Sequence, residues 1–277
     1  MYVLTSTDFQ LGHLDFSLLK TADGSFSLRY KLAHTDSATW TEPMHSSKGA
    51  WSETLHVYFP ALVESMTLSQ TTEPWKVASI GLGLGYNEIL SAALAFKSGL
   101  SSDQLRIYSF ESELPLQSAF RAFFSGSDRT TVPVELKLAY DHITDLACSH
   151  LQVDKQELQT FIRRLLNSGS LELHGRMDSE LLIRLDKNLY QSHCVLFDAF
   201  SPESSPLLWE LDLLDAIVAQ LCAPSSRFVS YASRTSLKRV LVSRGFQLSK
   251  KPGFAGKREC TCAARPEIKE KLKLKKD

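Results

Sequence analysis

The sequence predicts an α/β protein in which helices cover both faces of a mostly parallel sheet. Short apolar segments alternate with longer amphipathic segments of helical period, which is the pattern of chains that build parallel sheets. The first of these apolar segments, Trp75–Ile80, runs directly into a glycine-rich turn. Another, His193–Phe197, is followed at once by an acidic residue. Both features favour a ligand site at the carboxyl edge of the sheet.

Residues 1–70 are predicted to form a small β-rich extension that caps the larger domain. They are rich in Thr, Ser, Tyr, Phe and Val, with turn signals at Ala22–Gly24 and at Glu42–Pro43, so we expect short antiparallel strands. A helical piece is expected near Ser52–Phe59.

The main domain is expected to span residues 71–265. After Trp75–Ile80 and the glycine turn, we expect a helix at Tyr86–Lys97, a strand at Leu105–Phe110 and a helix at 114–125. A helical insertion follows at about 126–170, in which Asp154 and Glu157 have the spacing of a capping box. Further strands are expected at 171–177, 193–197, 227–231, 246–250 and 258–263, and further helices at 179–189, 207–221 and 236–243.

The composition excludes several classes of protein. With 277 residues, 43% of them hydrophobic, 13 Gly and 10 Pro, the chain is neither disordered nor fibrous. No apolar run approaches the roughly 20 residues that span a bilayer, and the N-terminus lacks the order of a signal peptide. The five cysteines are scattered, with no C-x-x-C pair, so no metal site is predicted. We therefore expect a cytoplasmic protein that neither associates with a membrane nor holds a metal ion.

The net charge of zero hides an asymmetry. Residues 227–277 contain 15 Lys+Arg and 4 Asp+Glu, a net charge of +11, which leaves −11 for the rest of the chain. Part of this charge lies in a basic tail, residues 266–277. A basic end of this kind favours contact with a polyanion such as RNA, although solvated helix ends and a solvated tail would look the same.

The glycine turn indicates a nucleotide-like cofactor. A strand that ends in such a turn before a helix lets the backbone approach a ligand closely. The dinucleotide-binding fingerprint places its third glycine three residues after the second. Here Gly81, Gly83 and Gly85 are spaced two and two, which suits S-adenosyl-L-methionine (AdoMet) better than a nicotinamide cofactor. A turn that only permits close packing is the simpler alternative.

Acidic residues follow the predicted strands. Glu111 is placed to accept hydrogen bonds from both ribose hydroxyls of a nucleoside. Asp178 is placed to accept from the adenine amino group, with Asp141 as its competitor. Asp198 follows four apolar residues of a buried strand, and we interpret it as a carboxylate that holds an amine beside the electrophile. For Glu111 and Asp178, a solvated surface acid is the alternative.

These residues belong to a longer pattern that resembles a known family, the methyltransferase domain of the bacterial protein that forms 5-methylaminomethyl-2-thiouridine in tRNA. The matches keep their order from residue 21 to about 262. The chain departs from the family pattern at five positions. The family often has an acid where this chain has Ser79, and usually has Thr, Gly, Asn and Gly where it has Leu84, Ala199, Ser205 and Met177. The matching segments are Asp23-Gly24-Ser25, His45-Ser46-Ser47-Lys48-Gly49-Ala50 with Glu53, the glycine turn with Asn87, Asp198-Ala199-Phe200-Ser201-Pro202 with Trp209, Lys238-Arg239, Gly245-Phe246, Gly253-Phe254 and Lys257-Arg258-Glu259.

The resemblance implies a Rossmann-like AdoMet-dependent methyltransferase fold with an antiparallel last strand. It implies N-methylation of the 5-aminomethyl group of (2-thio)uridine at the tRNA wobble position, by a form without the flavin-dependent oxidase domain. The implied partners are the anticodon stem-loop of tRNA and an upstream tRNA-modifying enzyme. Asp198 is the expected catalytic residue. The expected cofactor contacts are Glu53, Gly81, Gly83, Gly85, Asn87, Glu111 and Asp178, and the expected substrate contacts are Phe200, Pro202, Tyr231, Lys238, Arg239, Lys257 and Arg258.

Two other classes of function remain open from the sequence. An aminopropyltransferase of the spermidine-synthase type, or a methyltransferase of small amines, also needs an acid to hold an amine, but neither explains the basic C-terminal third. A non-catalytic RNA-binding module with a decayed cofactor site would explain Ser79 and Leu84. For His45 and His56, packing or capping is expected rather than proton transfer.

Overall fold

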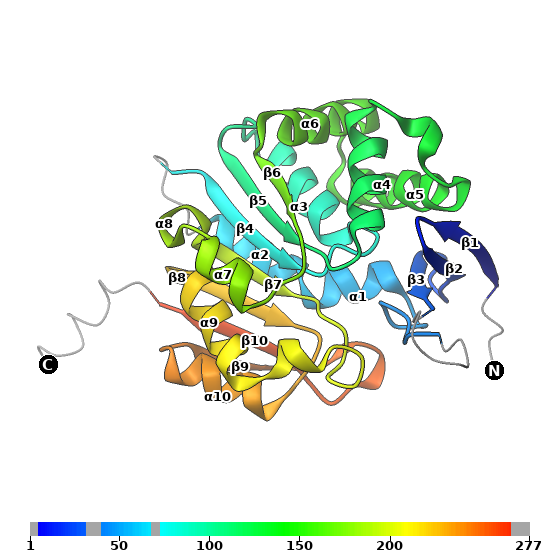
Figure 1. The fold of residues 1–277 in the computed structure, drawn as a ribbon. Coiled ribbons are helices and arrows are strands. Elements are labelled where there is room, and N and C mark those ends of the chain that lie inside the picture. The colour runs from blue at the N-terminus through cyan, green and yellow to red at the C-terminus, as the bar shows by residue number, and fades with distance from the viewer. Residues whose placement is uncertain (1–4, 32–39, 68–72, 267–277) are drawn as a thin grey trace, which may run out of the picture.

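The computed structural model describes residues 5–31, 40–67 and 73–266. Of the expected basic tail, residues 267–277 lie outside the described residues. Figure 1 shows one large twisted sheet between layers of helices, with a small separate sheet formed by the N-terminal strands beside α1 and α5. Within the described residues, no helix combines the length and the apolar character needed to cross a membrane.

The large sheet has seven strands in the order β6-β5-β4-β7-β8-β10-β9. The pairs from β6 to β8 are parallel, whereas β10 is antiparallel to both β8 and β9. The predicted fold class is therefore confirmed, including the antiparallel last strand. The strands are β4 (Trp75–Ile80), β5 (Leu105–Phe110), β6 (Leu171–His174), β7 (Ser192–Phe197), β8 (Cys222–Ser230), β9 (Gln247–Lys251) and β10 (Cys260–Arg265).

Alternating side chains of these strands feed two hydrophobic clusters, one on each face of the sheet. In β4, Val77 joins one cluster while Ala78 and Ile80 join the other. The first cluster lies under α1–α6, and the second lies under α7, α9 and α10. The helices on the first face are α3 (Tyr86–Lys97), α4 (Leu114–Ser125), α5 (Val134–Leu151) and α6 (Lys155–Ser168), and those on the second are α7 (Ser179–Arg184), α8 (Lys187–Tyr190), α9 (Leu211–Leu221) and α10 (Thr235–Ser243).

The insertion contains two long helices, α5 and α6, where the sequence predicted one. The predicted cap of α6 is present, because the Asp154 carboxylate accepts a hydrogen bond of 2.9 Å from the Glu157 amide. Helix α5 buries its apolar side, including Tyr140, against α3 and the aromatic side chains of α4. Tertiary packing of this kind stabilises a helix whose period is weak in the sequence.

Two predicted helices are each divided in two. The segment 179–189 divides into α7 and α8 because Asp186 accepts from the Asn188 amide and starts a second helix. The segment 207–221 divides into a 3₁₀ turn, η2 (Pro206–Trp209), and α9. The break lies at Glu210, whose backbone is extended (φ −65°, ψ 139°).

The N-terminal extension forms the predicted antiparallel strands, β1 (Ser6–Leu11), β2 (Leu14–Lys20) and β3 (Phe26–Tyr30). It also contains two helices, α1 (Ala50–Val57) and α2 (Phe59–Met66), where one helical piece was expected. The Asp23-Gly24-Ser25 motif caps α1 from a distance. The Asp23 carboxylate accepts from the Ser52 amide at 2.9 Å, and the Ser25 hydroxyl accepts from the Ala50 amide at 3.1 Å. These bonds fix α1, and with it Glu53, over the carboxyl end of the large sheet.

Candidate active site

The main cavity of the protein, about 460 Å³, lies at the carboxyl ends of β4, β5 and β7. Its floor is formed by the residues that directly follow these strands, and the N-terminal segment 42–46 and helix α1 close it from above. This is the edge at which open α/β sheets bind ligands. The predicted site residues that line it are Glu53, Gly81, Gly83, Asn87, Glu111, Asp198, Phe200, Tyr231 and Lys257.

The glycine turn passes very close to the chain after β7. Gly81 has a φ of +102°, and a Cβ built on it would lie 2.4 Å from the Asp198 carbonyl oxygen. Gly85 begins α3, and a Cβ on it would lie 2.4 Å from Cε2 of Phe120. Neither position has room for a side chain. Gly85 itself does not line the cavity, so its role here is in packing α3.

Glu111 ends β5 and is almost fully buried. Its carboxylate accepts hydrogen bonds of 3.0 Å from the Gly83 amide and 3.0 Å from the Glu113 amide. Burial raises the pKa of Glu111, while these two amides oppose the rise. The acid is thus tied to the glycine turn and faces the same cavity, as a ribose contact requires.

The turn lacks an acid at position 79, where Ser79 is buried in β4. A carboxyl group reaches this region from α3 instead. Glu88 is buried beside Ser79 and accepts a 2.6 Å hydrogen bond from the Ser109 hydroxyl of β5. Burial raises the pKa of Glu88 to about 7.

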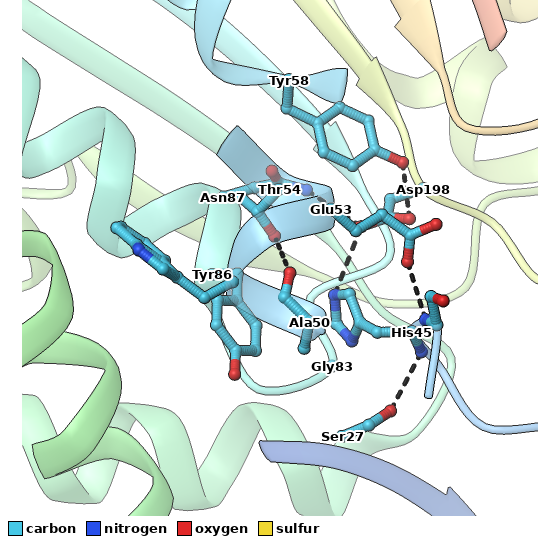
Figure 2. Close-up of polar contacts among 12 residues, drawn as sticks. Ser27, His45, Ala50, Glu53, Thr54, Tyr58, Gly83, Tyr86, Asn87 and Asp198 are labelled. Carbon is cyan, nitrogen blue, oxygen red and sulfur yellow. Dashed lines mark hydrogen bonds and ion pairs between the residues drawn. The ribbon is translucent and has the colours of Figure 1, made fainter. Parts of the chain in front are cut away.

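Asp198 is held at the centre of the site by groups from three parts of the chain (Figure 2). Its amide donates to the Ile80 carbonyl at 2.9 Å, which fixes its backbone beside the glycine turn. The Tyr58 hydroxyl donates to Oδ1 at 2.6 Å, and Nδ2 of Asn87 donates to Oδ2 at 3.2 Å. Nε2 of His45 lies 4.0 Å from Oδ2.

The environment of Asp198 shifts its titration into the physiological range. Burial raises the pKa of this carboxyl to about 6, although His45 and the Tyr58 hydroxyl both act to lower it. Only about 11% of its side chain is exposed, and it lines the cavity. An oriented carboxylate with this pKa can accept a hydrogen bond, or a proton, from a group inside the cavity.

A second charged group connects the N-terminal helix with the C-terminal segment. Glu53 is buried in α1 and accepts 2.7 Å and 3.1 Å hydrogen bonds from the Ser46 amide and from Nζ of Lys257. The Lys257 ammonium also lies 4.8 Å from the centre of the Tyr231 ring. Lys257 therefore faces the cavity and a buried carboxylate, whereas the sequence reasoning assigned it to RNA phosphates.

The structure does not bring Asp178 to the cavity. Asp178 caps α7, where its carboxylate accepts a 2.8 Å hydrogen bond from the Leu181 amide, while its neighbours Arg176 and Met177 line the cavity. Its competitor Asp141 lies on α5, 3.4 Å from Nζ of Lys155. We therefore do not retain either acid as a cofactor contact. The reason is that β6 ends at His174, so the predicted strand end at Met177 belongs to a loop.

The other predicted substrate contacts lie outside the main cavity. Pro202 lines a smaller neighbouring cavity. Lys238 forms a 2.6 Å ion pair with Glu259, so its charge is already balanced. Arg239 and Arg258 are exposed and line neither cavity.

Tyr58 was missed by the sequence reasoning, and His45 was assigned to packing. The His45 ring does pack on Tyr86, with 4.9 Å between ring centres, but it also lies beside Asp198. Tyr58 follows Glu53 by five residues at the junction of α1 and α2. Its buried position at a helix end is a feature of the tertiary structure, and no pattern in the sequence separates it from a core tyrosine.

The residues of the cavity fit a cationic nucleoside cofactor. Both ring nitrogens of His45 and Oδ1 of Asn87 are buried without a hydrogen-bond partner among the described residues, so polar groups are available to a ligand. No group of three His, Cys, Asp or Glu side chains in the described ranges is placed to hold a metal ion. The lining has more acids than permanent cations, namely Glu42, Glu53, Glu111, Glu113 and Asp198 against Arg176 and Lys257.

Comparisons with known proteins identify the class of fold. Residues 156–266 match the family model described as "S-adenosyl-L-methionine-dependent methyltransferase". The structure is similar to the crystal structure of MnmC2 from Aquifex aeolicus, with a TM-score of 0.59 and 23% identity over 92% of this chain and 74% of that one.

Two further methyltransferase structures are less similar. Precorrin-6y C5,15-methyltransferase from Geobacter metallireducens has a TM-score of 0.36 and 14% identity, over 74% of this chain and 87% of that one. The rRNA methyltransferase aviRa from Streptomyces viridochromogenes has a TM-score of 0.38 and 14% identity, over 76% and 85% of the two chains. The family match and the first structure confirm the predicted methyltransferase resemblance, and they support an AdoMet-dependent methyltransferase with AdoMet as its cofactor.

Proposed function

We propose that this methyltransferase transfers a methyl group to the 5-aminomethyl group of (2-thio)uridine at the wobble position of tRNA. The family resemblance of the sequence, the similarity to MnmC2 and the basic C-terminal third support this substrate. The observation that carries the proposal is the buried, doubly hydrogen-bonded Asp198 carboxylate beside the glycine turn. A carboxylate in this position can accept a hydrogen bond from an amine substrate and orient it next to the cofactor.

AdoMet, when bound, supplies an electrophilic methyl group on a sulfonium. We assign Gly81, Gly83 and Glu111 to the nucleoside part of the cofactor, and Glu53 and Asn87 to further contacts in the same cavity. The acid-rich lining favours a positively charged ligand such as this sulfonium.

The acceptor amine must reach the cavity without its extra proton, because only the neutral amine has a free lone pair. An alkylammonium has a pKa of roughly 10, so most of it is protonated at neutral pH. Asp198 accepts a hydrogen bond from this nitrogen and aims it, and it receives the proton or passes it to water. Tyr58 and Asn87 hold both carboxylate oxygens, so the orientation of Asp198 is set before the substrate binds.

Aromatic side chains flank the position of the acceptor base. Phe200 and Tyr231 both line the cavity, and the Phe200 ring packs against Tyr30, with 6.1 Å between ring centres. A base taken out of an RNA loop is normally held by stacking on such rings. The anticodon loop is single-stranded, so its bases are available for this kind of binding.

The direct test is mass spectrometry of tRNA nucleosides after incubation with the purified protein and AdoMet. We expect one methyl group to be added to 5-aminomethyl-2-thiouridine. Asp198→Asn keeps the shape of the side chain, removes the proton acceptor and should lower the methylation rate by about 10²- to 10⁴-fold. Calorimetry should show nearly unchanged AdoMet affinity for this variant.

Asp178→Asn is the matched control, because it changes an acid that caps α7 and does not line the cavity. It should methylate at close to the wild-type rate. Full activity of Asp198→Asn would rule out the proposed role of this carboxylate, and transfer of no methyl group to tRNA by the wild type would rule out the substrate.

A small free amine is the second candidate substrate, because the excess of carboxylates in the cavity also suits a polyamine. The same incubation with small amines in place of tRNA distinguishes the two. Methylation of the small amines, together with no saturable affinity for tRNA, would favour this candidate.

A further inference from the structure

A smaller cavity of about 190 Å³ lies directly beside the main one. The two cavities share Tyr231 and Lys257, which form the wall between them. The far side of the smaller cavity is formed by Ser201, Pro202, Ser233 and Arg234. A ligand in the main cavity and a covalently linked group in the smaller one would therefore lie on two sides of the same wall.

The charges around the smaller cavity leave one cation available for a ligand. Glu259 also lines this cavity, but it accepts hydrogen bonds of 2.6 Å from Nζ of Lys238 and 3.0 Å from the Ser233 hydroxyl. The Lys238 ammonium balances the charge of this carboxylate, and the Ser233 hydroxyl occupies it further. Lys257 is engaged with Glu53.

Arg234 is held much more weakly. Its guanidinium lies 3.5 Å from the Glu203 carboxylate, whose side chain is 73% exposed, and its own side chain is 46% exposed. An exposed pair of this length contributes little, so an anion can replace Glu203 at small cost. A guanidinium matches the two oxygens of a phosphate better than a lysine ammonium does.

We infer that the smaller cavity binds the nucleotide adjacent to the acceptor uridine in the RNA chain, with the Arg234 guanidinium on its phosphate. This rests on the proposed function. A base that enters the main cavity remains linked to its neighbours through phosphates, which must stay at the mouth. The shared wall of Tyr231, the flat face of Pro202 and the hydroxyls of Ser201 and Ser233 are groups of the kind that hold single-stranded nucleotides.

The test is binding of a fluorescently labelled, unmodified anticodon stem-loop RNA, followed by anisotropy at several salt concentrations. Arg234→Ala should raise the Kd about tenfold, as expected for loss of a charge-assisted hydrogen bond. The slope of log affinity against log salt should fall in magnitude by roughly 0.7, the value for one phosphate contact on a single strand. AdoMet affinity should stay at the wild-type value, which shows that the main cavity is intact.

Arg164→Ala is the matched control, because it removes an exposed cation from α6 that lines neither cavity and is not among the predicted substrate contacts. Equal weakening by Arg164→Ala would mean that the loss of any one positive charge has this effect, and wild-type affinity of Arg234→Ala would mean that Arg234 contacts no phosphate. Either result would overturn the inference. Arg234→Lys should give an intermediate Kd, because it keeps the charge and loses the two-pronged geometry.

Failure of this inference is distinguishable from failure of the proposed function. If tRNA is methylated and Arg234→Ala binds the stem-loop normally, the adjacent-nucleotide site is wrong and the methyl acceptor stands. If Arg234→Ala weakens binding but the wobble uridine receives no methyl group, RNA binding at this cavity stands and the acceptor is wrong.

Discussion

The two ends of the active cavity are built in different ways. The glycine-turn end is a continuous five-residue segment, Gly81–Gly85, whose properties come from its backbone. The Asp198 end is assembled from side chains far apart in the sequence, with His45 and Tyr58 from the N-terminal extension and Asn87 from α3. The first end depends on backbone angles that only glycine adopts easily, and the second depends on hydrogen bonds and burial.

This difference explains why the two ends should respond differently to mutation. A side chain added at Gly81 collides with the backbone after β7, so it disturbs the ends of β4 and β7 together. Removal of one hydrogen bond at Asp198 leaves the backbone in place and changes the charge equilibrium of a single carboxyl.

The largest effect is expected for Gly81→Ala. The new methyl group would lie 2.4 Å from the Asp198 carbonyl oxygen, at a φ of +102°. We expect loss of measurable AdoMet binding by calorimetry and a lower Tm.

Gly99→Ala is the matched control, because Gly99 also has a positive φ, +76°, but no atom within 4 Å of the added Cβ. It should cost only about 1–2 kcal/mol of unfolding free energy and should retain AdoMet binding. Equal losses in both variants would show that backbone strain, rather than close approach to Asp198, limits the turn.

A smaller and more specific effect is expected for Tyr58→Phe. The Tyr58 hydroxyl lowers the pKa of Asp198 by donating to its Oδ1 at 2.6 Å, so its removal should raise that pKa further above about 6. If ionised Asp198 is needed for transfer, the acid limb of the kcat–pH profile should move to higher pH by about one unit. The rate at pH 7 should fall only about twofold, and it should recover at higher pH. Tyr108→Phe is the control, since the Tyr108 hydroxyl donates to the Leu189 carbonyl outside the cavity. A Tyr58→Phe profile with the wild-type midpoint would separate Tyr58 from the titration of Asp198.

The smallest effect concerns stability. The pKa of Asp198 is raised from 3.8 to about 6 on folding, so the folded state holds this proton more tightly than the unfolded state. The resulting stabilisation is complete below pH 3.8 and is lost as pH rises through about 6. The side chain of Asp198→Asn does not titrate, so this variant does not lose the stabilisation. At pH values above about 6 its Tm should therefore be a few degrees higher than that of the wild type. The difference should vanish in acid. An unchanged difference in Tm across the whole pH range would mean that Asp198 does not titrate in the folded protein.

The prediction of secondary structure succeeded where local signals agreed with packing. The strands β4, β5 and β7 and the helix α3 lie within about one residue of their predicted bounds, because apolar runs ended by glycine or by an acid specify them locally. Helix α5 was missed because it is stabilised by contacts with α3 and α4 rather than by a strong period of its own. The end of β6 was placed three residues too far, and this error carried Asp178 into the predicted cofactor site.

The order of elements, the glycine turn and the acids that end β5 and β7 follow from the chain alone, because backbone freedom and apolar periodicity are properties of neighbouring residues. The partners of Asp198 do not follow from it. The Tyr58 hydroxyl meets that carboxylate across a sequence separation of 140 residues, after the Asp23 and Ser25 caps have fixed α1 over the sheet. The same holds for Lys257. Its basic neighbours in the sequence favoured RNA as its partner, whereas in the folded protein it forms an ion pair with the buried Glu53. Burial and charge pairing between residues far apart in the sequence depend on how the elements pack, and local sequence patterns do not specify them.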